Sequence, residues 1–434
     1  MSKKTIQIEK WNPVRKSSRI NNFFNRTVLE NDAVNVASTV LNDIRKRGDK
    51  ALIEACHKFD KSDVSLSSIL VSDKEIKSAI NKVDKSFKKS AKEAHNRIKK
   101  FSELSMRKNW FYNTSNGGNL GEVFIPFDRI GAYIPGGSAP LVSTALMTVT
   151  LAKTAGVKEI IGCSPPTYNG TINPYIIYAL HLAGATEVYK IGGIQAIGAM
   201  AYGTAKIKKV RKIVGPGGPY VTAAKQRVYG NVAIDMIAGP SEIAILCDTS
   251  SNPKWIAADL LSQAEHGTGL EKSLLVTTSL RYAEIIKKEV IEQAKKLKRS
   301  ELIRKVINKG MLFIVVDNLS QGVKLINEFA PEHMELIVKN PHIWISKIKT
   351  AGALFIGPWT PESVGDFVAG PSHVLPTGGS CHYFSGLTVD DFRRRMSVVE
   401  FSKKDLYESI PIIEDFGRVE TLDGHTKSAK IRFE

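Results

Sequence analysis

Short apolar segments alternate with helical segments through most of this chain, and no other feature of the sequence limits the fold as strongly. In the first half, the strand-like segments are residues 130–135, 158–163, 187–191, 211–214 and 231–236. In the second half, they are residues 243–247, 274–277, 311–316, 334–338 and 353–356. Strands that are joined by crossover helices form parallel sheets with helices on both faces. The sequence therefore predicts an α/β protein with two similar parallel sheets and a cleft between them.

Glycines gather at the carboxyl ends of three strands in the first half. These turns read Pro135-Gly-Gly137, Gly192-Gly193 and Gly215-Pro-Gly-Gly218. Ligands of open parallel sheets bind at the carboxyl ends of the strands, so we expect a ligand site there. No strand is followed by the Gly-x-Gly-x-x-Gly spacing that marks a dinucleotide fold. The glycines therefore indicate a site without naming its ligand.

The same alternation suggests how the chain divides. We expect residues 1–22 to form an amino-terminal arm, and residues 23–129 to supply a helical lead-in to a catalytic α/β domain at 241–380. Residues 130–240 form the second domain, and both domains are expected to be Rossmann-like. Residues 381–434 lack the alternation and the apolar content of a core, so they should form a tail that packs on another surface.

Composition narrows the class of protein. A chain of 434 residues that is 43% hydrophobic and 24% charged is typical of a globular protein with two or more domains. Its four cysteines are far apart, which indicates neither a disulfide framework nor a cysteine zinc site and favours a reducing cytoplasm. The first ten residues lack the apolar core of a signal peptide, and no apolar run is long enough to span a bilayer, so we expect no membrane insertion.

The net charge of +18 raises the alternative of a nucleic-acid-binding protein. The lysines of residues 82–92 and 287–298, however, are mixed with acidic and apolar residues at helical spacing. This pattern is typical of solvated helix faces, and no aromatic platform or binding module accompanies it. Such a protein would lose affinity steeply with salt, and we expect no nucleic-acid partner.

A glutamate and a histidine stand side by side where a predicted helix gives way to a predicted strand. Residues 321–329 carry apolar side chains at helical spacing, Pro331 interrupts that helix, and residues 335–338 are typical of a buried strand. Glu332 and His333 would point in different directions and reach different protons of one substrate. Histidine titrates close to neutral pH and can accept and return a proton. The simpler alternative is a surface pair.

A second cluster of polar residues lies on the helix that Asn252 and Pro253 should begin as N-cap and first residue. On this helix Asp259, Gln263 and His266 share a face. The last two could bind one metal ion, although a hydrogen-bonded surface pair has the same spacing. Ionisable groups also stand in the glycine- and proline-rich turns Gly239-Pro-Ser-Glu242, Gly365-Asp366, Gly370-Pro-Ser-His373 and Glu420-Thr-Leu-Asp-Gly-His425. Polar groups in such turns suggest a functional site.

These phrases together closely resemble the histidinol dehydrogenase family. The matching segments are Ala132-Tyr-Ile-Pro-Gly-Gly137, Gly192-Gly-Ile-Gln-Ala196, Gly239-Pro-Ser-Glu-Ile243, Ser262-Gln-Ala-Glu-His266, Pro331-Glu-His333, Val364-Gly-Asp-Phe367 and Gly370-Pro-Ser-His373-Val-Leu-Pro-Thr-Gly-Gly379. They occur in family order, and the resemblance covers nearly the whole chain. It implies oxidation of L-histidinol to L-histidine, with two hydrides passed to two NAD molecules through a retained aldehyde. This is the last step of histidine biosynthesis.

The resemblance also implies roles for individual residues. One zinc ion per subunit would be bound by Gln263, His266 and Asp366, with His425 supplied by the partner in a homodimer that shares its sites. His333 matches the base that takes the alcohol proton, and Glu332 matches the base that activates water to hydrate the aldehyde. The positions that match substrate contacts are Ser241, Gln263, His266, His333, Asp366, His373, Glu420 and His425. The positions that match NAD contacts are Tyr133, Gln195 and Gly218.

One position departs from the family pattern, because the family usually has asparagine where this chain has Gly218. A side-chain contact to the cofactor is then lost, which leaves only main-chain contacts.

The residues alone are also compatible with a second function, that of a zinc-dependent hydrolase, since the same ligands beside Glu332 could activate water on an amide or ester. Formation of NADH from histidinol separates the two reactions.

Overall fold

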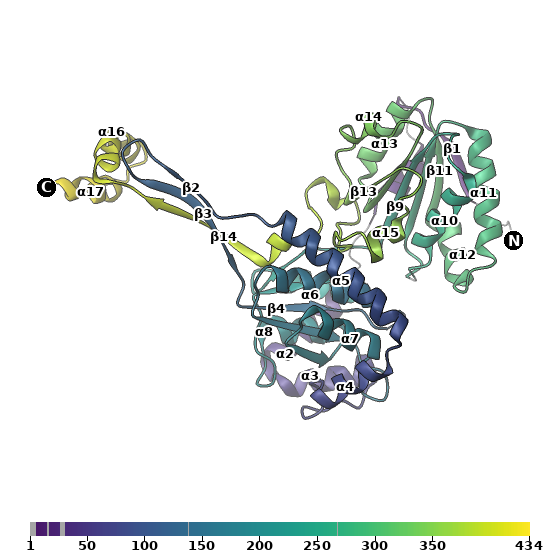
Figure 1. Ribbon diagram of the computed structural model, residues 1–434, viewed down its shortest axis with the longest axis horizontal. Helices are drawn as coiled ribbons and strands as arrows, with labels where there is room; N and C mark the ends of the chain where they lie inside the picture. The colour runs from purple at the N-terminus through teal and green to yellow at the C-terminus, as the bar shows by residue number, and fades with distance from the viewer. Residues whose placement is uncertain (1–5, 15–16, 27–30, 138, 267) are drawn as a thin grey trace.

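The computed structural model describes residues 6–14, 17–26, 31–137, 139–266 and 268–434. Residues 1–5 and 15–16 of the expected amino-terminal arm lie outside the described residues. The chain forms two α/β units and a long arm that projects from one of them and carries the carboxyl terminus (Figure 1). Among the described residues, no helix has both the length and the apolar character needed to cross a membrane.

The smaller sheet has five parallel strands in the order β6-β5-β4-β7-β8. The strands are β4 (Arg129–Tyr133), β5 (Glu159–Ser164), β6 (Glu187–Lys190), β7 (Lys212–Val214) and β8 (Ala233–Ile234). Every residue of the central strand β4 is buried, as expected for a parallel strand covered on both faces. The strand order reverses between β4 and β7, and a ligand of such a sheet binds beside that reversal.

The larger sheet has six parallel strands in the order β1-β11-β10-β9-β12-β13. They are β1 (Gln7–Lys10), β9 (Glu242–Cys247), β10 (Lys272–Thr277), β11 (Met311–Val315), β12 (His333–Ile337) and β13 (Ala353–Ile356). All ten predicted strands are therefore present, and the two Rossmann-like sheets are confirmed. Strand β1 comes from the expected arm, so part of the arm is an edge strand of this sheet.

Helices cover both faces of each sheet (Figure 1). On the smaller sheet, one face carries α4 (Asp73–Lys82), α5 (Lys85–Ser105), α6 (Val142–Thr154) and α7 (Pro174–Ala183), and the other carries α2 (Asn31–Arg47), α3 (Asp49–Ala55), α8 (Gly193–Tyr202) and α9 (Pro219–Val228). On the larger sheet, one face carries α10 (Pro253–Ala264), α11 (Leu280–Ala294) and α12 (Ser300–Lys309), and the other carries α1 (Ser18–Phe24) and α13 (Leu319–Phe329). Two shorter helices, α14 (His342–Ile345) and α15 (Glu362–Phe367), follow in the second unit.

The packing of α2–α5 differs from the expected division of the chain, which grouped residues 23–129 with the catalytic domain. Ala37 and Leu41 of α2 and Ala94 and Ile98 of α5 are buried in the two cores of the smaller unit instead. The crossover helices α6–α9 supply only two helices to each face of that sheet. The apolar faces of α2 and α5 extend this cover, which accounts for their position.

The arm is built from two distant parts of the sequence. Strand β3 (Asn119–Pro126) pairs antiparallel with both β2 (Trp110–Asn113) and β14 (Arg393–Glu400). Helices α16 (Lys403–Val419) and α17 (Asp423–Lys430) lie at its tip (Figure 1). The arm exposes large apolar side chains, which include Phe111, Tyr112, Met396, Val399, Phe401, Tyr407, Ile412, Phe416 and Val419. An apolar surface of this extent is typical of an interface.

Candidate active site

The Glu332-His333 pair lies where the sequence predicts it, between the end of α13 and the start of β12. Ala330 ends the helix in a left-handed conformation at φ 49°, and Pro331 leads into the strand. Both side chains are buried, which rules out the alternative of a surface pair. Because His333 is the first residue of β12, the pair stands at the amino end of its strand, beside the amino end of β9.

The contacts of His333 define its protonation state. Its Nδ1 atom lies 3.2 Å from the main-chain oxygen of Glu242, which can only accept a hydrogen bond. Nδ1 is therefore the atom that carries the proton, and Nε2 is left with a free lone pair. Nε2 is buried, has no hydrogen-bond partner among the described residues, and stands 3.7 Å from Asp366 Oδ1. Burial lowers the pKa of His333 to about 4, so the ring is neutral at pH 7 and can accept a proton.

Glu332 is held by the turn that precedes β9. Its Oε2 accepts a hydrogen bond from the main-chain N–H of Glu242 at 2.9 Å, and the side chain of Ser241 also hydrogen-bonds to it. Burial raises the pKa of Glu332 well above its ordinary range, and the nearby carboxylates of Glu242 and Asp366 raise it further. A carboxylate in this environment is a stronger base than one in water.

Four further residues complete the cluster from two helices. Asn252 caps α10 and Pro253 is its first residue, as predicted. The helix places Gln263 in its last turn and His266 just beyond its end, so the two residues share one side of it. Helix α15 contributes Glu362 and, one turn later, Asp366.

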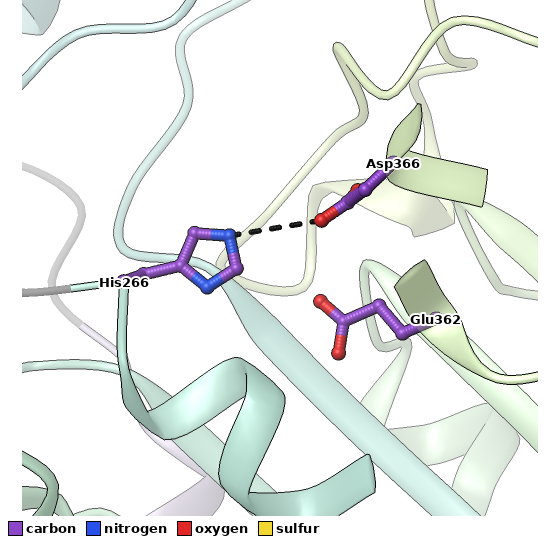
Figure 2. Close-up of side chains that lie close together, drawn as sticks. All are labelled: His266, Glu362 and Asp366. Carbon is purple, nitrogen blue, oxygen red and sulfur yellow. Dashed lines mark ion pairs between the residues drawn. The ribbon is translucent and has the colours of Figure 1, made fainter. Parts of the chain in front are cut away.

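Figure 2 shows His266, Glu362 and Asp366 pointing toward one another, with His266 Nε2 3.9 Å from Asp366 Oδ2. Potential ligand atoms of these three residues all lie within 4.8 Å of one another. This spacing fits the binding of one metal ion. Gln263 is fully buried beside them, with its amide 3.3 Å from His266 Nδ1.

His373 links the cluster to the smaller α/β unit. Its Nδ1 lies 3.2 Å from the main-chain oxygen of Asp366, and its Nε2 lies 3.0 Å from Thr144 Oγ1. Thr144 belongs to the first turn of α6, which follows the carboxyl end of β4. The cluster therefore lies at the junction of the two units, where the carboxyl end of one sheet meets the amino ends of strands in the other.

The three residues expected at the cofactor lie at the carboxyl ends of the smaller sheet. Tyr133 ends β4, and its hydroxyl accepts a hydrogen bond from Gly193 N at 3.2 Å. Gln195 is fully buried and donates to Asp60 Oδ2 at 2.9 Å, while its own oxygen has no partner in the described part of the chain. Gly218 is the N-cap of α9. These positions match the glycine-rich turns from which a ligand site was expected.

Two predicted site residues do not join the cluster in their own chain. Glu420 ends α16 and His425 lies in α17, and both are exposed at the tip of the arm (Figure 1). One residue of the cluster was not predicted at all. Glu362 stands four residues before Asp366, and this spacing on a helix was the available signal for it.

A buried histidine and several carboxylates at the junction of two parallel sheets define an α/β enzyme with acid/base chemistry. The histidinol dehydrogenase family model matches residues 25–433 of this chain. The histidinol dehydrogenase of Bacillus thuringiensis subsp. konkukian is 42% identical over 409 residues, which are 94% of this chain and 94% of the relative. That of Clostridium acetobutylicum is 42% identical over 402 residues, or 93% of each chain.

A solved structure agrees with the sequence comparison. The crystal structure of histidinol dehydrogenase from Elizabethkingia anophelis matches with a TM-score of 0.93 and 38% sequence identity, covering 99% of this chain and 98% of that one. The chain therefore belongs to the histidinol dehydrogenase family and is an oxidoreductase. Membership in this family supports the oxidation of histidinol in histidine biosynthesis.

Proposed function

We propose that the protein oxidises L-histidinol to L-histidine in two NAD-dependent steps, through histidinal that stays in the site. The observation that carries this proposal is the buried, unpartnered Nε2 atom of His333 beside Asp366. A base placed in this way can take the hydroxyl proton of a bound alcohol while hydride leaves the same carbon. The reaction would be the last step of histidine biosynthesis, and a cytoplasmic location stays a prediction.

The donor set fits one zinc ion. Gln263, His266 and Asp366 offer an amide oxygen, an imidazole nitrogen and a carboxylate, and the last two approach each other in the cluster. A second copy of the chain would add His425. Zinc in this set would keep a net positive charge, because only Asp366 is anionic, and would hold the imidazole and amino nitrogens of the substrate. Ser241, His373 and the second copy's Glu420 would add further substrate contacts.

The two bases would divide the proton transfers. His333 accepts the alcohol proton at Nε2 in the first oxidation, because its Nδ1 proton is held by the carbonyl of Glu242. Glu332 removes a proton from water as that water adds to the aldehyde carbon, and His333 returns its proton to the aldehyde oxygen, which gives the neutral hydrate and leaves His333 free to act again. His333 then accepts a hydroxyl proton from the hydrate as the second hydride leaves. Burial of both side chains keeps bulk water from competing.

The carboxyl ends of the smaller sheet fit NAD. Tyr133 and Gln195 are positioned by Gly193 and Asp60, and the buried oxygen of Gln195 has no hydrogen-bond partner among the described residues. At Gly218, a Cβ atom would meet nothing within 4 Å, so the turn is open. NAD bound here would supply the hydride acceptor. The strand order reverses at this place, as it does in other nucleotide sites.

The arm supports a homodimer with shared sites. Glu420 and His425 are polar groups suited to a buried site, yet both are exposed on the arm of their own chain. The apolar side chains along the same arm require a covering surface. A second copy that binds this arm would bury those side chains and receive both polar groups.

The proposal is tested by following NADH and zinc together. The purified protein should contain one zinc per chain and form two NADH for each histidinol that becomes histidine. A matched variant, His333→Gln, should keep its zinc and lose most of its NADH formation. Absence of NADH formation by the folded, zinc-loaded wild type, or hydrolysis of an amide or ester instead, would overturn the proposed reaction.

A further inference from the structure

Glu362 is a buried carboxylate that the proposed reaction does not use. Its side chain is 1% exposed, and it lies in the middle of the polar cluster. Oε2 accepts a hydrogen bond from Ser262 Oγ at 3.0 Å, and Oε1 lies 3.4 Å from His333 Nδ1. The main-chain N–H of Glu362 donates to Glu335 Oε1 at 2.8 Å, which fixes the start of α15. Burial raises the pKa of Glu362 well above its ordinary range, and a polar side chain this deeply buried is held by its hydrogen bonds.

The neighbouring amide of Gln263 points to that role. Hydrogen bonding selects the orientation in which the amide nitrogen donates to Glu362 Oε1 at 2.9 Å, within reach of Glu242 O at 3.2 Å. The amide oxygen then faces His266 Nδ1 at 3.3 Å. In the opposite orientation, the amide oxygen would face the carboxyl oxygen of Glu362 and the main-chain oxygen of Glu242, with only the N–H of His333 at 3.2 Å to donate to it.

This orientation matters for metal binding. An amide binds a metal ion through its oxygen, because its nitrogen carries two hydrogens and no available lone pair. Gln263 can therefore serve as a ligand only while its nitrogen is held on the other side. Glu362 supplies a carboxyl oxygen as the acceptor there, 2.9 Å from the amide nitrogen.

We propose that Glu362 is a positioning residue that turns the amide oxygen of Gln263 toward the metal. This inference rests on the zinc site proposed above. Ser262 and the start of α15 hold Glu362 in place, so the carboxylate does not rotate with the amide. Groups that orient a metal ligand in this way contribute to metal affinity without touching the ion.

The competing interpretation is that Glu362 itself binds the metal ion, because it stands within the same cluster as His266 and Asp366. The two interpretations predict different effects on zinc affinity when two substitutions are combined. A residue that acts only through Gln263 loses its effect once the amide is gone, whereas a direct ligand or a general structural residue does not.

The experiment measures the zinc dissociation constant of the whole protein by competition with a chromophoric chelator. Glu362→Gln should bind zinc about 10- to 100-fold more weakly than the wild type. In a Gln263→Ala background, the same change should alter the dissociation constant by no more than about three-fold. Glu335→Gln is the matched control. It keeps an oxygen for the N–H of Glu362 and should stay within about three-fold of the wild type.

A second set of variants tests the orientation of the Gln263 amide. Gln263→Glu alone would place two carboxylates face to face and should weaken zinc binding. Combined with Glu362→Gln, it should recover affinity above that of Glu362→Gln alone, because a carboxylate presents an oxygen in either orientation and the new amide at 362 can donate to it. Thermal melting and the mass of the assembly show whether each variant is folded. Should Glu362→Gln fail to fold, Ser262→Ala, which removes one anchor of the carboxylate, replaces it in the cycle.

Additive losses in the Gln263→Ala background, or unchanged affinity in the folded Glu362→Gln variant, would overturn the positioning role while the zinc site stands. A wild-type protein that binds no zinc would overturn the metal assignment and this role together. The wild-type measurement therefore separates the two failures.

Discussion

The main chain of Glu242 holds both proposed bases, because its carbonyl oxygen lies 3.2 Å from His333 Nδ1 and its N–H donates to Glu332 Oε2 at 2.9 Å. One peptide segment at the start of β9 therefore sets the tautomer of the histidine and the position of the carboxylate. The side chain of Glu242 pairs with Arg26 at 2.8 Å, and both are buried. This pair anchors the segment from the opposite side.

The two bases should be separable by substitution. We expect His333→Asn to reduce turnover of both histidinol and added histidinal, since a hydroxyl proton leaves in each oxidation. Glu332→Gln should act mainly on the aldehyde step, because only that step needs activated water. The loss of one general base costs a factor of about 100 to 10,000. Stopped-flow measurement of NADH with each substrate checks this, and equal losses on both substrates for both variants would contradict the division.

The proposed dimer with shared sites predicts complementation between two inactive variants. His333→Asn damages the core of the site, and His425→Ala damages the arm that would reach the second copy. In a mixed dimer, one site then combines an intact core with an intact arm, and the other site carries both changes. Denaturing and refolding the variants together should restore about a quarter of wild-type sites. If activity stays at the level of the separate homodimers although mixed dimers form, His425 acts in its own subunit.

Substitution of Gly218 by asparagine is expected to raise the affinity for NAD. Its φ of −68° suits any residue, and a Cβ atom there would meet nothing within 4 Å. Gly218→Asn should therefore lower the KM for NAD by about two- to tenfold, the equivalent of one hydrogen bond, and leave the KM for histidinol unchanged. Gly218→Ala fits the same space without a polar group and is the control. An equal change in both variants would place the effect in the main chain rather than in the amide.

No thiol is expected to take part in the second oxidation. Cys56, Cys163 and Cys247 are buried, and burial raises the pKa of all three thiols. Cys381 lies nearest to Glu332, but it donates to the main-chain oxygens of Pro331 and Pro376, and burial raises its pKa to about 12. A variant with all four cysteines changed to Ala or Ser should still form two NADH per histidinol. A folded variant that stops after the first NADH would show that a thiol nucleophile is needed.

A buried carboxyl pair under the site predicts a pH-dependent stability. Asp259 and Glu335 share a hydrogen bond, and burial raises the pKa of Asp259 to about 6 and that of Glu335 well above its ordinary range. A raised folded-state pKa gives stability that is complete below the unfolded pKa and lost as pH rises through the folded value. Wild-type stability should therefore fall between about pH 4 and pH 7 through this pair.

Glu335→Gln removes one charge of the pair and keeps an oxygen for the N–H of Glu362. Its decline over this pH range should be shallower, and at pH 8 it should be more stable than the wild type by about 1 kcal/mol. Thermal melting at a series of pH values measures this difference. A steeper decline in the variant would show that the pair is not the source of the pH dependence.

The sequence by itself determined most elements of the two parallel sheets, because these strands and helices follow from local patterns of apolar residues. Ten of the fourteen strands among the described residues, the cap of α10 by Asn252 and the end of α13 before Pro331 could be predicted from neighbours in the chain. The side-by-side position of Glu332 and His333 is also fixed by their adjacency. These features depend on interactions over a few residues, which a single sequence contains.

Only the tertiary structure decided which elements meet. The packing of α2 and α5 on the smaller sheet depends on which apolar faces remain uncovered after folding, and the chain order does not reveal this. Glu362 enters the cluster because α15 packs against α10, and its carboxyl oxygen is an acceptor there for the amide of Gln263. The arm likewise joins strands more than 250 residues apart in sequence, such as Asn119 and Glu400. Contacts of this kind arise from the packing of the whole chain, so no local pattern encodes them.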